Sequence, residues 1–112
     1  FEGDVEQFEA VSMAPTQVLP VVSGTAMAPA FGHIFSGGYA AGYYGYKWAE
    51  VLEADAFSLF KEKGIFNREA ASSFRENVLA KGGTEHPMEL YVRFRGHKPE
   101  TRALIEKMGL GK

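Results

Sequence analysis

The sequence of 112 residues contains no cysteine. Disulfide bonds, thiolate metal ligands, iron–sulfur clusters and cysteine nucleophiles are therefore excluded from this chain. It also lacks a run of about 18 apolar residues, so no membrane span is predicted. Neither a G-x-x-x-x-G-K-[ST] phosphate loop nor a G-x-G-x-x-G turn after a strand occurs. With 46% hydrophobic and 13% aromatic residues, the chain has the composition of a packed protein of one domain.

Charge is missing from a long internal stretch. Between Ala10 and Tyr46 there is no Asp, Glu, Lys or Arg, and all twelve Lys and Arg residues lie from Lys47 onward. With a net charge of −2 and no early basic residues, the chain is not expected to bind nucleic acid. An uncharged surface favours being covered, so we expect this stretch to pack on other domains or to line a cleft. The alternative is that it wraps the chain's own helices. If left uncovered, it could make the isolated chain self-associate.

Helical patterns dominate the sequence, which predicts an all-α fold with no strand of consequence. Residues 1–10 resemble the end of a helix, and residues 13–32 form an irregular segment rich in proline and glycine, because proline disfavours helix interiors. A glycine turn is expected over residues 33–38. Helices are expected over residues 40–63, 67–81, 87–96 and 99–108. Their predicted ends rest on the capping residues Gly64, Asn67, Gly82, Gly83, Pro87, Gly96 and Pro99.

The longest predicted helix presents two different faces. At 100° per residue, one face forms an ordinary core stripe of Tyr44, Trp48, Val51, Leu52 and Leu59. Three tyrosines fall together on the other side, namely Tyr39, Tyr43 and Tyr46.

These three phenols can each donate a hydrogen bond at neutral pH. His33 and the pair Gly37–Gly38 lie just before them. A glycine turn followed by such donors suits the binding of a peptide backbone or of a developing oxyanion. The alternative interpretation is that the tyrosines are half-buried packing residues with hydrated hydroxyls.

The sequence contains no H-E-x-x-H motif, and its histidines, His33, His86 and His97, are not paired at helical spacing. No metal site is therefore expected in this chain. Glu85 and His86 precede Pro87 and are expected to cap a helix. The carboxylates Glu50, Glu53 and Asp55 are expected at the surface or at a domain interface.

The segment from Phe31 to Leu52 reads FGHIFSGGYAAGYYGYKWAEVL, and further matching motifs are Ala54–Phe57, Gly64–Asn67, Lys81–Thr84 and Arg93–Gly96. Over nearly its whole length the chain resembles the C-terminal part of the thimet oligopeptidase family of zinc metallopeptidases. Within that family the sequence is most similar to the bacterial oligopeptidase and peptidyl-dipeptidase branches, which it does not separate.

The resemblance implies a cytoplasmic, two-lobed helical zinc peptidase that hydrolyses short peptides in a deep channel. The zinc ligands and the general base would lie upstream of Phe1. Residues 1–112 would then be one C-terminal fragment of the catalytic domain, inactive alone, with residues 1–38 forming a helix end and an irregular segment and 39–112 the helices. Its partners would be peptide substrates and the remainder of that domain.

By the same resemblance, Tyr46 stabilises the oxyanion that forms at the scissile carbonyl. His33 and Tyr39 contact the substrate backbone, and Tyr43 lies on the same stripe. The turn at Gly37–Gly38 flexes as the channel closes on a peptide. The alternative function is a non-catalytic helical module that binds peptides or a partner helix on the tyrosine stripe.

Overall fold

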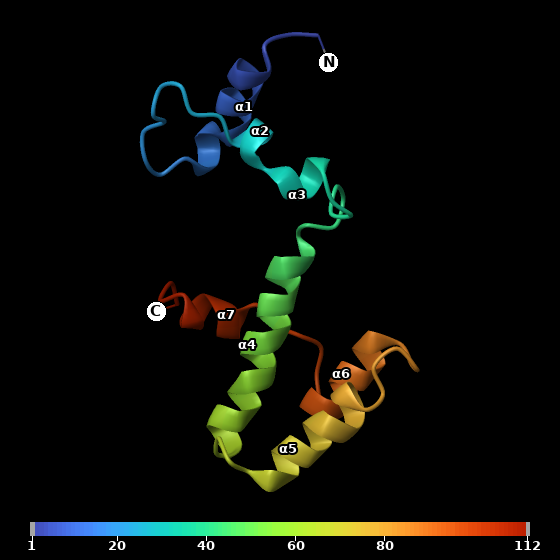
Figure 1. The fold of residues 1–112 in the computed structure, drawn as a ribbon. Helices are drawn as coiled ribbons and strands as arrows, with labels where there is room; N and C mark the ends of the chain where they lie inside the picture. The colour runs from blue at the N-terminus through green and yellow to red at the C-terminus, as the bar shows by residue number, and fades with distance from the viewer. Residues whose placement is uncertain (1, 112) are drawn as a thin grey trace. The chain divides into compact units, whose positions relative to one another are not determined.

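The computed structural model describes residues 2–111, which form helices and turns without any strand (Figure 1). The predicted all-α class is therefore confirmed. The chain divides into two compact units, the first ending at Tyr43 and the second beginning at Tyr44. Among the described helices, none has the length and hydropathy that crossing a membrane would require.

The first unit contains α1 (Val5–Met13), the 3₁₀ turn η1 (Ala14–Thr16) and two one-turn helices, α2 (Met27–Ala30) and α3 (Gly32–Phe35). Helix α1 begins at an N-cap, because the Asp4 carboxylate accepts a hydrogen bond from the Gln7 amide at 3.0 Å. The expectation that residues 1–10 are the end of a helix was therefore wrong. Asp4 starts a new helix, and that helix continues to Met13.

The uncharged stretch folds back on α1. Both carboxylate oxygens of Glu9 accept hydrogen bonds at 2.8 Å, one from the Met27 amide and one from the Ala28 amide. These two amides are otherwise unpaired donors at the start of α2, so Glu9 caps that helix from a distance. No residue of α1, η1, α2 or α3 is buried. The stretch thus wraps one helix of its own unit without building a core.

The second unit is organised around α4 (Gly45–Lys63), its longest helix. The sequence predicted a start near Ala40, but residues 39–44 are turns and the helix begins at Gly45. Gly42 lies between the predicted and the observed start and disfavours helix there, because a glycine in a helix costs about 1 kcal/mol relative to alanine.

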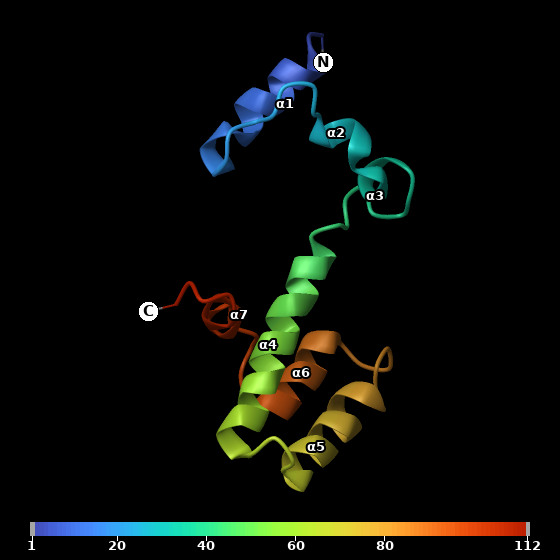
Figure 2. The ribbon, with the colours of Figure 1, turned by 60° about the vertical axis from the view of Figure 1, so that its left-hand side comes forward.

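The other helices of this unit are α5 (Arg68–Phe74), the π-helical turn η2 (Arg75–Leu79), α6 (Pro87–Arg95) and α7 (Arg102–Lys107). Within the unit, α5, η2 and α6 lie together on one side of α4 and α7 lies on another (Figures 1 and 2). The second predicted helix therefore widens into a π turn after Phe74, and the last one begins after Pro99, at Arg102.

The predicted caps Gly64, Asn67, Pro87 and Gly96 are confirmed, whereas Pro99 does not open the last helix and η2 ends at Leu79, before Gly82. Gly64 ends α4 with φ 105°, and Gly96 ends α6 with φ 89°, a conformation that favours glycine. Pro87 occupies the first turn of α6, and His86 caps that helix by accepting a hydrogen bond from the Met88 amide at 3.2 Å.

A small core joins α4, α5 and α6. Its buried members are Ala56, Leu59, Ala70, Tyr91 and Phe94, with Leu52, Phe60, Phe74 and Val78 packed against them. The rings of Phe74 and Phe94 meet edge to face, with centroids 5.1 Å apart.

Asn67 fixes the start of α5, because its side-chain oxygen accepts a hydrogen bond from the Ala70 amide at 2.9 Å. We expect Asn67→Ala to lower the free energy of unfolding of the second unit by about 1 kcal/mol. Asn67→Asp keeps the acceptor oxygen, so it should lower the free energy of unfolding much less than Asn67→Ala. Urea unfolding followed by circular dichroism measures both, and an equal loss in the two variants would contradict the capping role.

Glu85, just before α6, forms ion pairs with Arg93 and Lys81. Its carboxylate lies 2.7 Å from the Arg93 guanidinium and 3.0 Å from the Lys81 ammonium. Hydrogen bonds from Arg93 and then from Lys81 lower the pKa of Glu85 from 4.5 to about 2. Because the folded-state pKa is the lower one, the stabilisation is present above pH 4.5 and is lost as the pH falls toward 2.

We therefore expect the urea midpoint to fall more steeply between pH 4.5 and pH 2 in the native sequence than in Glu85→Gln. The three side chains are partly exposed, so the difference should shrink in 1 M salt. Identical pH dependence in the two proteins would show that the ion pairs of Glu85 do not contribute to the stability of the fold.

Candidate functional site

Three of the predicted site residues lie together in the first unit. The ring of His33 is 6.0 Å from that of Tyr39 and 5.4 Å from that of Tyr43, measured between centroids. A fourth ring, Phe31, contacts Tyr43 edge to face at 4.5 Å. We call these four side chains the aromatic cluster. Sequence reasoning assigned no role to Phe31, although its position two residues before His33 was a usable signal.

The backbone builds this cluster with short turns. Phe31 joins α2 to α3, and α3 carries His33. The Tyr39 carbonyl then accepts hydrogen bonds at 3.1 Å from the amides of Gly42 and Tyr43. This single helical turn keeps the predicted i, i+4 relation of Tyr39 and Tyr43, although the residues lie before α4 rather than on it.

Both tyrosines of the aromatic cluster are partly exposed to solvent. The Tyr39 side chain is 42% exposed and that of Tyr43 is 38% exposed. Edge-to-face contacts stabilise the arrangement of aromatic rings, and phenol hydroxyls and imidazole nitrogens are groups that can exchange hydrogen bonds. Such a surface can stack against an extended peptide and also exchange hydrogen bonds with its backbone.

Gly37 and Gly38 separate α3 from the tyrosine turn. A Cβ atom at Gly37 would lie 3.5 Å from the His33 carbonyl oxygen, an ordinary contact, and one at Gly38 would meet nothing within 4 Å. Neither glycine has a positive φ. Sterics in this conformation therefore do not require glycine at either position.

Tyr46 belongs to the second unit, where it lies in the first turn of α4 and is 46% exposed. It follows that the predicted stripe of three tyrosines on one continuous helix was wrong, since α4 includes only Tyr46. Of the predicted core stripe, Val51 and Leu59 are buried and Leu52 is partly buried. Tyr44 and Trp48 are exposed, because the described core lies farther along α4.

The acidic residues of α4 divide into two groups. Glu50 pairs with Lys47 at 2.8 Å and Glu53 with Lys107 at 2.6 Å, both at the surface as expected. Asp55 was expected at the surface or at a domain interface, but it is buried inside the second unit, with 3% exposure. Its partners lie on α6, far away in sequence, which explains why the local pattern concealed its burial.

A metal-binding group is not present among residues 2–111, where no three His, Asp or Glu side chains converge. His86 caps α6, and the nearby Glu85 pairs with Lys81 and Arg93. The described residues therefore do not fit a zinc ion.

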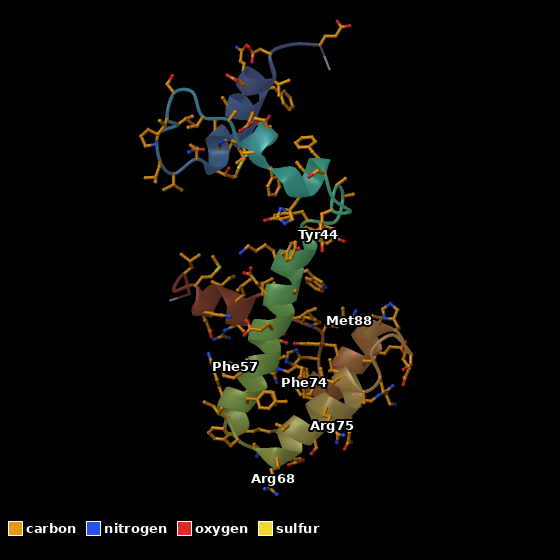
Figure 3. All side chains as sticks on the ribbon, in the orientation of Figure 1. Tyr44, Phe57, Arg68, Phe74, Arg75 and Met88 are labelled. Carbon is orange, nitrogen blue, oxygen red and sulfur yellow. The ribbon has the colours of Figure 1, made fainter. Side chains whose placement is uncertain are left out.

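The second unit also has an apolar groove between α4 and the α5–η2 segment. The groove measures about 390 Å³, and its walls include Phe57 on α4 and Phe74 on α5 (Figure 3). Phe57 is 41% exposed there. An apolar surface of this kind favours contact with another protein segment.

Comparison with known proteins identifies the family of the chain. Residues 4–110 match the family model described as Peptidase family M3. Oligopeptidase A of Escherichia coli is 56% identical over 93 residues, covering 83% of this chain and 14% of that protein. A probable cytosolic oligopeptidase A of Arabidopsis thaliana is 46% identical, covering 85% of the chain and 14% of that protein.

A dipeptidyl carboxypeptidase of Salmonella typhimurium is 38% identical over 110 residues, which cover 97% of the chain and 16% of that protein. The chain therefore spans about a seventh of the length of the curated relatives it matches.

The 4.5 Å separation of the Phe31 and Tyr43 rings predicts a direct nuclear Overhauser effect between their ring protons. Tyr43→Leu should abolish this signal and shift the His33 ring protons, since they lose the ring current of Tyr43. Two-dimensional NMR of the 112-residue chain with labelled aromatic residues measures both effects. Absence of the Phe31–Tyr43 signal in the unsubstituted chain would contradict the cluster.

Proposed function

Because the chain belongs to peptidase family M3, we propose that it forms part of the substrate channel of a zinc peptidase that hydrolyses short peptides. The observation that carries this proposal is the aromatic cluster, in which His33, Tyr39 and Tyr43 lie within ring contact. The chain spans only 12% to 16% of the relatives. It should therefore be inactive alone, with the zinc ligands supplied by the rest of the polypeptide.

Tyr46 is the proposed catalytic residue. During hydrolysis water adds to the scissile carbonyl carbon, and the carbonyl oxygen gains negative charge. A phenol hydroxyl is neutral near pH 7 and can donate a hydrogen bond to that oxygen. The position of Tyr46 in the first turn of α4, with nearly half of its side chain exposed, supports this role.

The aromatic cluster is the proposed binding surface for the substrate backbone near the cleaved bond. His33 and Tyr39 offer polar atoms, while Tyr43 fixes the position of the His33 ring and extends the surface. The turn at Gly37–Gly38 would flex when a peptide enters.

The rest of the catalytic domain is the proposed partner of the chain's apolar surfaces. It would cover the groove beside Phe57 and Phe74, together with the uncharged stretch before Tyr46. Uncovered, these surfaces would favour self-association of the isolated chain.

Higher identity to the oligopeptidases than to the dipeptidyl carboxypeptidase supports an oligopeptidase specificity. The Arabidopsis relative named as cytosolic supports a cytoplasmic location. Both assignments concern the full-length protein.

The direct test is Tyr46→Phe in the full-length protein that carries this sequence, assayed with a short fluorogenic peptide. We expect kcat to fall by about 100-fold or more with little change in KM, since the lost hydrogen bond acts in the transition state. Tyr44→Phe is the matched control, because Tyr44 is a neighbouring and more exposed tyrosine, and it should retain activity. An unchanged kcat in Tyr46→Phe would refute the proposed role.

A further inference from the structure

A buried polar network joins α4 to α6 and has no part in the proposed binding surface. The Tyr91 hydroxyl donates a hydrogen bond to Asp55 Oδ2 at 2.5 Å. Arg95 Nε lies 3.8 Å from the same oxygen. Asp55 and Tyr91 are both buried, and the Arg95 side chain is only 11% exposed. Three polar groups thus meet inside a small core.

The same two α6 side chains also bind the backbone and side chains of α4. Tyr91 Oη lies 3.4 Å from the Leu52 carbonyl oxygen. Arg95 Nε donates to the Asp55 carbonyl at 3.2 Å, and its terminal nitrogen donates to Ser58 Oγ at 2.9 Å and Glu62 Oε1 at 3.0 Å. Together these contacts run along one stripe of α4 from Leu52 to Glu62.

Such a network is costly compared with an apolar core, because a carboxylate and a guanidinium are both removed from water. Burial and the hydrogen bond to Asp55 raise the pKa of Tyr91 above its ordinary value, so its hydroxyl keeps its proton as the donor. In return, the network fixes the rotation of α4 about its axis relative to α6. Apolar side chains tolerate small rotations of a helix, whereas hydrogen bonds to carbonyl and carboxylate oxygens weaken when their geometry changes.

Tyr46 lies on the opposite side of the same helix. Asp55 lies nine positions after Tyr46, which at 100° per residue amounts to two and a half turns, or about 13.5 Å along the axis. A rotation of α4 by about 10° displaces an atom at the rim of the helix by about 1 Å. An error of about 1 Å in a reacting group can cost about 100-fold in rate.

We propose that Asp55 is a positioning residue, which holds the rotation of α4 through Tyr91 and Arg95 and thereby directs the Tyr46 hydroxyl toward the scissile carbonyl. This inference rests on the proposed function of Tyr46. It adds a residue on the buried face of α4 that acts without touching the substrate.

The test is a double-mutant cycle in the full-length protein, using Asp55→Asn, Tyr46→Phe and the combination. Asparagine has the shape of aspartate but loses the charge that Arg95 faces. We expect Asp55→Asn alone to lower kcat by about tenfold with KM changed less than about twofold. In the Tyr46→Phe background the same substitution should change kcat by less than about twofold, because the group it positions is already gone.

Two further variants complete the design. Glu69→Gln is the matched control, a carboxylate-to-amide change at an exposed position of α5, and it should leave kcat unchanged. Tyr91→Phe replaces Asp55→Asn in the cycle if that variant does not fold, since it removes only the donor hydroxyl. All assays are run well below the melting temperature of the least stable variant.

The outcomes separate the two proposals. If Asp55→Asn lowers kcat equally in both backgrounds, Asp55 acts on general stability and the positioning role is overturned, while the role of Tyr46 stands. An unchanged kcat in Asp55→Asn overturns positioning as well. If Tyr46→Phe itself has no effect, the proposed function fails and the positioning of Tyr46 fails with it.

Discussion

The arrangement of the second unit depends on one buried contact, the hydrogen bond from Tyr91 to Asp55 with Arg95 beside it. The apolar core around this contact is small, and none of its large side chains is completely buried. Hydrophobic packing alone would therefore specify the rotation of α4 weakly. The polar network adds directional bonds at Leu52, Asp55 and Ser58, and these oppose rotation and sliding of α4 against α6. Burying these charges costs stability, but the resulting hydrogen bonds define the orientation of α4, the helix that carries Tyr46.

Features with local causes could be predicted from the sequence. Gly64, Asn67, Pro87 and Gly96 were assigned to helix ends, and the structure places each of them there. Each acts on backbone groups within four residues of itself, so the local sequence is enough to predict the interaction.

Features with distant causes could not be predicted in this way. Asp55 was expected at the surface or at a domain interface because nothing near it in sequence reveals Tyr91 and Arg95, its partners on α6. Glu9 caps α2 across the intervening loop, again without a local signal. The start of α4 was placed too early because the tyrosine spacing suggested helix while the glycines opposed it.

The candidate site shows the same division between local and distant causes. The i, i+4 relation of Tyr39 and Tyr43 is local and was expected from their spacing, whereas the contacts of His33 and Phe31 with them arise from short turns that the spacing did not predict. Among residues 2–111 no three His, Asp or Glu side chains converge, so the proposed role of Tyr46 depends on its direction relative to the rest of the complete protein.

The most direct measurement is a crystal structure of the full-length protein with a phosphinic peptide, whose phosphinyl oxygen mimics the tetrahedral oxyanion. We expect the Tyr46 hydroxyl at hydrogen-bond distance from that oxygen, about 2.7–3.1 Å. We also expect Asp55 to remain hydrogen-bonded to Tyr91 in that complex. A Tyr46 hydroxyl directed away from the phosphinyl oxygen, with another donor in its place, would contradict the proposed role of Tyr46.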